Sequence, residues 1–432
     1  MTYTIFQTLF KTHLALFANR FATAIFGLCL LGLSPSNAAD LRIGMVAPIS
    51  GPLAKLGQET VIGSQIAVDI INEQGGVNGQ KVVLTVADTP TPDLAKSEVE
   101  RLVLNEKIKA IVGNYGSSLA IASSTTAVRH GAFYWEQSSS SYDITRKADP
   151  YAVKTTWGNF ELIQTLENVV KNVIAPRLNK PANEVRIAIL HEDSGWGSEL
   201  AQLMQEVIKS NRLKVVYIQG YNAARTSDFT PMILRMKQET PDVVVAASYL
   251  TDAVKFQQQS KDQNFNVKAM IGFTAGYGIS DFATTLGKSA NDILVIDSNP
   301  EINTKSMNAE AQKLNREFIN RFTKQTGKPP ASHALYAFLG SYTFFKHVLP
   351  KSTSMEPDAI LKSAMSLDLP FGSLPMGFGI QFSKPTDERP RYNQRGLTIL
   401  NQWRDGKLVA VYPNEHATEQ IRNIPLPAWS QR

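Results

Sequence analysis

The chain has 432 residues, of which 43% are hydrophobic and 19% are charged. This composition excludes an intrinsically disordered protein and is sufficient for two or three globular domains. The formal net charge at pH 7 is +6, but the lysines and arginines are scattered, so no basic stripe indicates a nucleic-acid partner.

The first 39 residues have the pattern of an export signal. Lys11 and Arg20 form a sparse positive region, and an apolar run follows over residues 21–33. We therefore predict a signal peptide over residues 1–39, with cleavage near Ala39. A membrane anchor is the alternative, although the apolar run is short for a span.

Cysteine usage agrees with export. Cys29, the only cysteine, lies within the apolar run, so the mature chain would carry no disulfide and no thiol chemistry. Leu28 is too large for a lipoprotein cleavage site, and nothing after residue 39 is apolar over a membrane-spanning length. These features together predict a soluble protein of the periplasm.

From residue 41 on, short apolar runs alternate with stretches in which apolar residues recur at helical spacing. Strands are expected over residues 41–46, 81–87 and 110–112, and helices over 58–73 and after Thr91-Pro92. The valine-rich run 81–87 shows little alternation, which predicts a strand buried on both faces. Alternating strands and helices predict a parallel sheet with right-handed crossovers.

The pattern then repeats beyond a boundary near residues 157–159. A strand over residues 151–155 precedes this boundary, and further strands are expected beyond it over residues 185–190, 213–218, 242–247, 268–271 and 293–296. Helical stretches over 311–322 and 334–347 follow, and Asp405-Gly406 predicts a hairpin turn near the end of the chain. The sequence thus indicates two α/β units in series.

Two hydroxyl-rich turns follow strands of the first unit. One covers residues 113–118, and the other contains the four serines of residues 138–141. In an open parallel sheet such turns lie at the carboxyl ends of the strands, where small ligands bind. Helix starts there suit a carboxylate, because their first N–H groups lack partners. The alternative is that both turns are ordinary loops.

The motifs of common enzymes are absent from the sequence. The six histidines show no metal-ligand spacing, and neither H-E-x-x-H nor G-x-S-x-G occurs. No complete P-loop or dinucleotide-binding glycine pattern is found. The sequence therefore favours a binding protein over an enzyme and predicts neither a metal nor a cofactor.

Several segments together resemble the branched-chain amino-acid (Leu/Ile/Val) binding proteins of bacterial ABC importers. The segments are Ile43-Gly44 with Pro48–Pro52, Asn72–Gly79, Ile111–Gly113, Asp193–Gly197 and Gln402–Gly406. The resemblance covers nearly all of the mature chain. It implies the type I periplasmic binding protein fold: two doubly wound α/β lobes of parallel sheet, joined by a three-crossing hinge, with the ligand between them.

The resemblance also implies how the chain is divided. Lobe one would comprise residues 40–157 and 300–369, and lobe two would comprise residues 158–299. Residues 370–432 would form the hinge return and a tail that belongs mainly to lobe two.

The family's ligand contacts fall on identifiable residues of this chain. The serine that holds the ligand carboxylate resembles Ser117, and Trp196 stands where the family usually has tyrosine. The backbone N–H groups of the second serine turn would be free for the ligand. The full set of predicted ligand-binding residues is Leu56, Tyr115, Ser117, Ser118, Glu136, Ser138, Ser139, Ser140, Trp196, Thr274 and Tyr277. The alternative for each is a loop or packing residue.

One departure from the family concerns the ligand's ammonium group. Amino-acid binders place an acidic residue in the turn that here covers residues 272–278, and this turn contains none. A buried ammonium without a carboxylate is costly. Glu136 or Asp143 could replace the missing acid. Otherwise the ligand is a carboxylate without an amine, an amide or an aromatic acid, for which Tyr115, Trp135 and other aromatic residues offer stacking area.

The leading hypothesis is an exported, monomeric solute-binding protein. It would trap a small polar or carboxylate-bearing solute and deliver it to an ABC permease at the inner membrane. The alternative is a ligand sensor whose closed form is presented to a receptor or regulator. An exported enzyme is a third possibility, for which the sequence offers no catalytic cluster.

Overall fold

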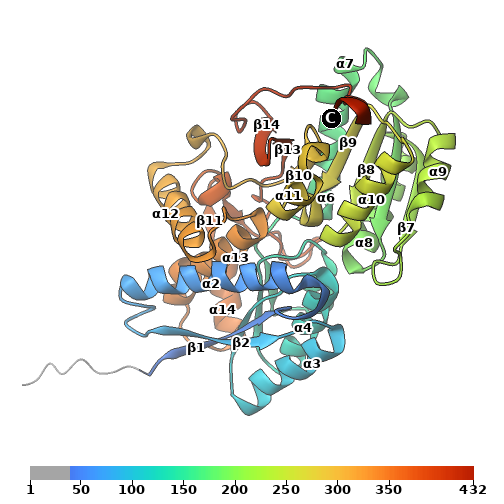
Figure 1. Ribbon diagram of the computed structural model, residues 1–432. Coiled ribbons are helices and arrows are strands. Elements are labelled where there is room, and N and C mark those ends of the chain that lie inside the picture. The colour runs from blue at the N-terminus through green and yellow to red at the C-terminus, as the bar shows by residue number, and fades with distance from the viewer. Residues whose placement is uncertain (1–38) are drawn as a thin grey trace, which may run out of the picture.

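The computed structural model describes residues 39–432, so the predicted signal peptide lies outside the described residues except for Ala39. The described chain forms two lobes, each built on its own sheet (Figure 1). One sheet has five strands and the other has seven.

The first lobe is a parallel sheet with helices on both faces. Its strands are β1 (Leu41–Ala47), β2 (Val82–Asp88), β3 (Ala110–Gly113), β4 (Phe133–Glu136) and β5 (Ala152–Lys154), in the order β2-β1-β3-β4-β5. Its helices are α2 (Ala54–Glu73), α3 (Pro92–Glu100), α4 (Ser117–Arg129), α5 (Asp143–Lys147), α12 (Ala309–Thr326), α13 (Ser332–Thr343) and α14 (Pro357–Met365). Ile43 and Met45 of β1 pack under α2 and α13, whereas Val46 packs under α3 and α4.

Strand β2 differs from its prediction. It lies at the edge of the sheet and pairs only with β1. Several of its side chains are partly exposed, and Val86 is 38% exposed. The prediction of a strand buried on both faces is therefore wrong, because strand order in the sheet decides exposure and the valine content of one strand does not reveal it.

The second lobe repeats the plan with a longer sheet. Its parallel strands are β6 (Arg186–Glu192), β7 (Lys214–Tyr221), β8 (Val243–Ala247), β9 (Ala269–Phe273) and β10 (Leu294–Asp297). Antiparallel strands β13 (Ile399–Arg404) and β14 (Lys407–Tyr412) complete the order β14-β13-β10-β9-β8-β6-β7 and form the predicted hairpin.

Helices cover both faces of this sheet as well. They are α6 (Asn159–Val169), α7 (Ala175–Arg177), α8 (Gly195–Lys209), α9 (Thr230–Gln238), α10 (Leu250–Asp262) and α11 (Ser280–Leu286). Residues of α6 and α8 pack with Ile187 and Ile189 of β6, whereas residues of α9 and α10 pack with Ala188 and Leu190. The predicted fold class, two doubly wound α/β lobes, is confirmed.

Three segments connect the two sheets, after β5, after β10 and before β13. Hydrogen bonds join the three segments. Trp157 Nε1 donates to Ser298 Oγ at 3.1 Å, and Ser298 Oγ donates to the carbonyl oxygen of Leu397. Movement of one lobe against the other would therefore bend all three segments together.

Residues 380–393 lie against the first lobe before the third segment begins. Tyr392 pairs with Lys154 of β5, and the buried Arg391 side chain donates to the carbonyl oxygens of Ala152 (3.1 Å) and Thr145 (2.8 Å). A short ladder of β11 (Asp368–Leu369) and β12 (Ile380–Gln381) precedes this stretch.

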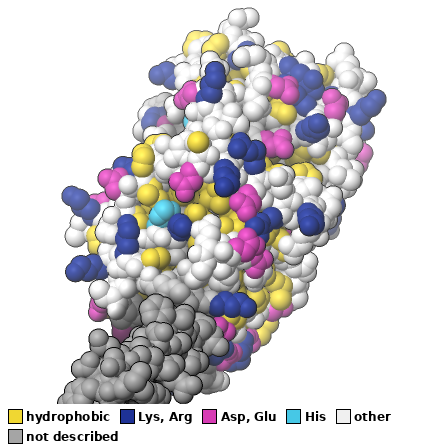
Figure 2. Space-filling model, turned by 90° about the vertical axis from the view of Figure 1, so that its left-hand side faces the viewer, with side chains coloured by type: hydrophobic (Ala, Val, Ile, Leu, Met, Phe, Trp, Pro, Cys, Tyr) yellow, Lys and Arg dark blue, Asp and Glu magenta, His cyan; other side chains and the backbone are white. Residues whose placement is uncertain are grey.

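None of the helices within residues 39–432 is long and apolar enough to span a membrane. On the face shown in Figure 2, lysine and arginine side chains are interspersed with aspartate and glutamate. The scattered charge expected from the sequence is thus seen on this face, where no basic patch gathers.

Candidate functional site

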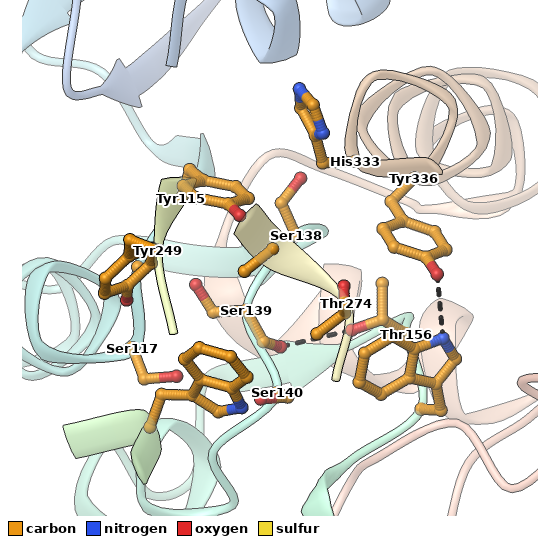
Figure 3. Close-up of a pocket in the computed structure, with 14 residues that line it drawn as sticks. Tyr115, Ser117, Ser138, Ser139, Ser140, Thr156, Tyr249, Thr274, His333 and Tyr336 are labelled. Atoms are coloured by element: carbon orange, nitrogen blue, oxygen red, sulfur yellow. Dashed lines mark hydrogen bonds between the residues drawn. The ribbon is translucent and has the colours of Figure 1, made fainter. Parts of the chain in front are cut away.

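A cavity lies between the two lobes and holds about 430 Å³ of empty space, part of it open to solvent (Figure 3). Its lining consists of Tyr115, Gly116, Ser117, Ser138, Ser139, Ser140, Thr156, Trp157, Trp196, Tyr249, Thr274, Ala275, His333 and Tyr336. This mixture of aromatic and hydroxyl groups is typical of a site for a small molecule.

The lining comes from the carboxyl ends of strands in both sheets. The first lobe supplies the turns after β3 and β4, and the second supplies Trp196 at the start of α8, Tyr249 before α10 and the turn after β9. In that last turn, Thr274 and Ala275 have φ angles of 29° and 37°. Such strained backbone is concentrated at ligand sites. The topology therefore brings together the strand-end turns that the sequence analysis selected.

Seven of the eleven predicted residues line the cavity, namely Tyr115, Ser117, Ser138, Ser139, Ser140, Trp196 and Thr274. Leu56 and Ser118 do not. Leu56 packs in a small apolar cluster with Tyr115 and Ile279, so it lies behind the tyrosine ring. Ser118 Oγ accepts a hydrogen bond from Gly195 N of the second lobe at 2.9 Å, so it joins the lobes beside the cavity.

Tyr277 is fully buried and also lies outside the lining. Its ring packs against Phe282, with ring centres 5.0 Å apart. A Cβ atom on Gly272 would lie 2.0 Å from Tyr277 Cγ, so the missing side chain at Gly272 makes room for this ring. The structure does not place Tyr277, a predicted ligand-binding residue, in the lining, because the turn directs its ring into the core of the second lobe.

Glu136 is buried at the end of β4 and organises both serine-rich turns. Its Oε1 accepts hydrogen bonds from the backbone N–H groups of Gln137, Ser138 and Ser139 at 2.7–3.0 Å. Its Oε2 accepts from Asn114 N (2.9 Å) and Tyr134 OH (3.1 Å). Burial raises the pKa of Glu136 to about 7, against the lowering effect of these donors.

This arrangement corrects two sequence-based predictions. Glu136 does not line the cavity, and the N–H groups of Ser138 and Ser139 are not free for a ligand because Glu136 already accepts them. A carboxylate next to a ligand turn can face the ligand or cap the turn, and only the fold distinguishes the two.

Most hydroxyl groups of the lining also have protein partners. Ser139 Oγ donates to Asn114 O at 2.9 Å, and Ser140 Oγ lies 3.0 Å from Asn159 Oδ1. Ser117 Oγ accepts from Ser141 N at 3.3 Å. Three polar atoms of the lining, Ser138 Oγ, Trp196 Nε1 and His333 Nε2, are buried without a hydrogen bond of good geometry among residues 39–432, and of these only His333 Nε2 has a charged neighbour, Glu59 Oε2 at 2.9 Å. The free pair is therefore Ser138 Oγ and Trp196 Nε1. Buried polar groups are normally satisfied, so these two are available to a ligand.

The lining residues include no aspartate, glutamate, lysine or arginine. Asp297, close behind the lining at the end of β10, accepts hydrogen bonds from Tyr336 OH and Ser332 Oγ, both at 2.6 Å, and from Ser298 N. Burial raises its pKa. His333 Nε2 lies 2.9 Å from Glu59 Oε2 and its ring packs against Tyr115. Within residues 39–432 no cluster of potential metal ligands occurs.

Comparison with known proteins places this chain in a family. The sequence profile of the periplasmic binding proteins matches residues 40–394. The chain belongs to the periplasmic binding protein family. The predicted resemblance to the Leu/Ile/Val-binding proteins is confirmed as well. The Leu/Ile/Val-binding protein homolog 8 of Brucella abortus (strain 2308) is 32% identical over 392 residues, which are 89% of this chain and 93% of that protein.

Solved structures agree on the fold. The branched-chain amino acid substrate-binding protein LivJ from Streptococcus pneumoniae, in complex with isoleucine, is 20% identical, with a TM-score of 0.70 over 85% of this chain and 97% of that one. A solute-binding protein of an ABC transporter from R. palustris, in complex with 4-hydroxybenzoate, is 19% identical, with a TM-score of 0.70 over 90% of this chain and 99% of that one.

Several lining residues of this periplasmic binding protein were not predicted. Tyr249 lies two residues after the end of strand β8, so the strand-end rule that selected residues 113–118 would have found it too. His333 and Tyr336 lie on α13, far along the chain. Every residue of α13 is buried, so no polar face marks the two side chains that reach the cavity.

The lobes touch each other beside the cavity. Asp281 of α11 forms ion pairs with Lys55 of α2 and with Lys328, which follows α12. The hydrogen bond from Gly195 N to Ser118 Oγ connects α8 of the second lobe to α4 of the first. These contacts join the two lobes across the cleft.

Lys154 lies at the first crossing between the lobes and is fully buried. Its ammonium donates to the carbonyl oxygens of Thr156 (3.2 Å) and Trp157, two residues that line the cavity. Burial lowers the pKa of Lys154 to about 8, and the nearby Glu161 and Glu199 oppose this shift.

This shift predicts a pH-dependent stability. Between pH 8 and 10.5 the unfolded chain holds the Lys154 proton more tightly than the folded chain does, so folding becomes more favourable as the pH rises. The unfolding free energy of the wild type, minus that of Lys154→Met, should rise over this interval by up to about 3 kcal/mol. Denaturant-induced unfolding of both proteins at a series of pH values measures this difference in unfolding free energy. A flat or falling difference would contradict the shift, and Lys147→Met is the exposed control.

Proposed function

We propose that this chain is an exported solute-binding protein that encloses a small polar or carboxylate-bearing solute between its lobes and delivers it to an ABC permease at the inner membrane. The observation that carries this proposal is the pair of buried, unpartnered polar atoms, Trp196 Nε1 and Ser138 Oγ, in a hydroxyl-lined cavity between two lobes. Empty, these atoms would cost folding free energy, whereas a bound solute would satisfy them.

Binding without covalent chemistry is the role we assign to the cavity. The hydroxyl groups of Ser117, Ser139 and Ser140 are engaged with backbone or amide groups rather than with a general base. His333 faces Glu59 on the side of α2. An activated nucleophile needs its base within hydrogen-bond reach, and these serines have none.

The same proposal covers the division of the chain, its state and its location. Lobe one would be residues 40–157 and 300–369, and lobe two residues 158–299. Of residues 370–432, which the sequence assigned mainly to lobe two, residues 380–393 lie against lobe one instead, whereas β13 and β14 join the sheet of lobe two. A monomer would suffice because one chain supplies the whole cavity lining. Removal of residues 1–39 during export would leave the protein in the periplasm.

Calorimetric titration with amino acids, amides and small carboxylic acids tests the proposal. Trp157 and Trp196 line the cavity, so intrinsic fluorescence should change with the same midpoint as the heat signal. One solute bound per chain and recovered unchanged is the expected result. Absence of binding across the whole panel, or conversion of a solute to a product, would refute it.

A further inference from the structure

We propose that the solute is a small aromatic carboxylate that carries no ammonium group. This inference rests on the proposed function and names the class of ligand. Proteins of this fold have been solved with isoleucine and with 4-hydroxybenzoate, so the fold alone does not choose between an amino acid and an amine-free acid. The groups around the cavity of this chain favour the amine-free acid.

An ammonium group would find no free carboxylate here. Four buried carboxylates lie close to the cavity lining, and each already accepts several hydrogen bonds from the protein. A fifth carboxylate, Glu59 of α2, is paired with His333 of the lining at 2.9 Å. Glu136 accepts five hydrogen bonds, and Asp297 accepts three. Glu192 accepts from Ser194 and Gly197, and Glu199 accepts from neighbours that include Tyr142 N and Asn159 Nδ2. A buried cation without an anion is strongly disfavoured.

The polar groups of the lining that lack a partner would instead bind a hydrogen-bond acceptor on the solute. The indole of Trp196 can only donate, its side chain is 4% exposed, and its Nε1 has no partner among residues 39–432. The hydroxyl of Ser138 is the second free group. Carboxylate oxygens accept from both kinds of donor, and bonds to a charged acceptor are the stronger ones.

Helix α4 adds a second reason to expect an anion. Gly116 and Ser117, at its start, both line the cavity. No side chain caps this end, and no acidic residue lies in its first turn. The positive end of a helix of 13 residues therefore faces the solute without compensation. With Trp196 and Ser138, this end can stabilise a carboxylate without a lysine or an arginine.

The walls of the cavity favour an aromatic ring. Five aromatic side chains line it, Tyr115, Trp157, Trp196, Tyr249 and Tyr336. Trp196 and Tyr249 lie with ring centres 5.5 Å apart, and Figure 3 shows Tyr115 on the same side as Tyr249, with Tyr336 opposite. Trp157 Nε1 donates to Tyr336 OH at 3.0 Å, so this ring lies beside Tyr336. Rings placed around a narrow space favour a planar ligand through edge and face contacts.

Calorimetry with ligand pairs that differ by one group tests this class. The pairs are 3-phenylpropanoate with phenylalanine and 4-methylpentanoate with leucine, together with benzoate against benzamide. We expect each acid to bind about tenfold or more tightly than its partner, and the aromatic acids to bind more tightly than 4-methylpentanoate. Equal or tighter binding of the amino acids or of benzamide would overturn the inference.

The variant Trp196→Phe keeps a ring and removes the N–H donor. We expect it to weaken binding of the aromatic acid about tenfold in a protein that remains folded without solute, as its thermal unfolding transition would show. Trp429→Phe is the matched control, because that indole donates to Phe265 O far from the cavity lining. Unchanged affinity of Trp196→Phe would contradict the assignment of the donor. If only amino acids or amides bind, the inference fails and the proposed function stands. If no solute binds, the proposed function itself fails.

Discussion

Replacing Glu136 with glutamine is expected to lower the free energy of unfolding by about 3–5 kcal/mol. The carboxylate accepts five hydrogen bonds from buried donors on two turns and on β4. A glutamine side chain has a single acceptor oxygen, and its NH₂ group would face N–H donors. Donors left without a partner in the interior cost about 1–3 kcal/mol each, and local relaxation recovers part of that cost.

Denaturant-induced unfolding without solute measures this loss. Tyr134→Phe is the control, because it removes only one of the five donors to Glu136 and should cost about 1 kcal/mol. The Glu136→Gln protein should also bind solute more weakly, since the carboxylate holds the turn that contains Ser138. A loss no larger than that of Tyr134→Phe would show that Glu136 does not hold the turns together.

The order of secondary-structure elements could be predicted from the sequence because their signals are local. Apolar runs followed by amphipathic stretches indicate parallel α/β units, and Asp405-Gly406 marks the hairpin between β13 and β14. The position of a strand within its sheet is not local. The valine content of β2 predicted a buried strand, and only the pairing shows that it lies at the edge.

The candidate site shows the same limit. Residues 113–118 and 138–140 could be selected because strand-end turns of a parallel sheet meet at one edge. The sequence could not show that Glu136 caps these turns or that Tyr277 turns into the core, since both outcomes depend on side-chain direction. His333 comes from a helix that is buried all round, so no amphipathic pattern marks it.

Locking the two lobes together is expected to abolish uptake of solute. Ser118 on α4 and Gly195 on α8 face each other across the cleft, and a Cβ atom on Gly195 would lie 3.1 Å from Ser118 Oγ. This distance matches a disulfide, in which the Cβ atom of one cysteine lies about 3 Å from the Sγ atom of the other. The mature chain would have no other cysteine, because Cys29 lies in the predicted signal peptide. The double variant Ser118→Cys/Gly195→Cys should therefore form one intramolecular bond.

Mass spectrometry establishes that the bond has formed, and the two single variants report any effect of the substitutions themselves. A solute held between lobes must enter by their separation. If the lobes are locked before solute is added, association should slow by about 100-fold or more, and reduction should restore it.

The most direct measurement is the rate of solute association with this double variant, oxidised and then reduced, followed by tryptophan fluorescence. The account predicts almost no binding signal in the oxidised protein and the rate of the single variants after reduction. Equal, rapid binding in both states would show that solute reaches its site without separation of the lobes, which contradicts a site enclosed between them.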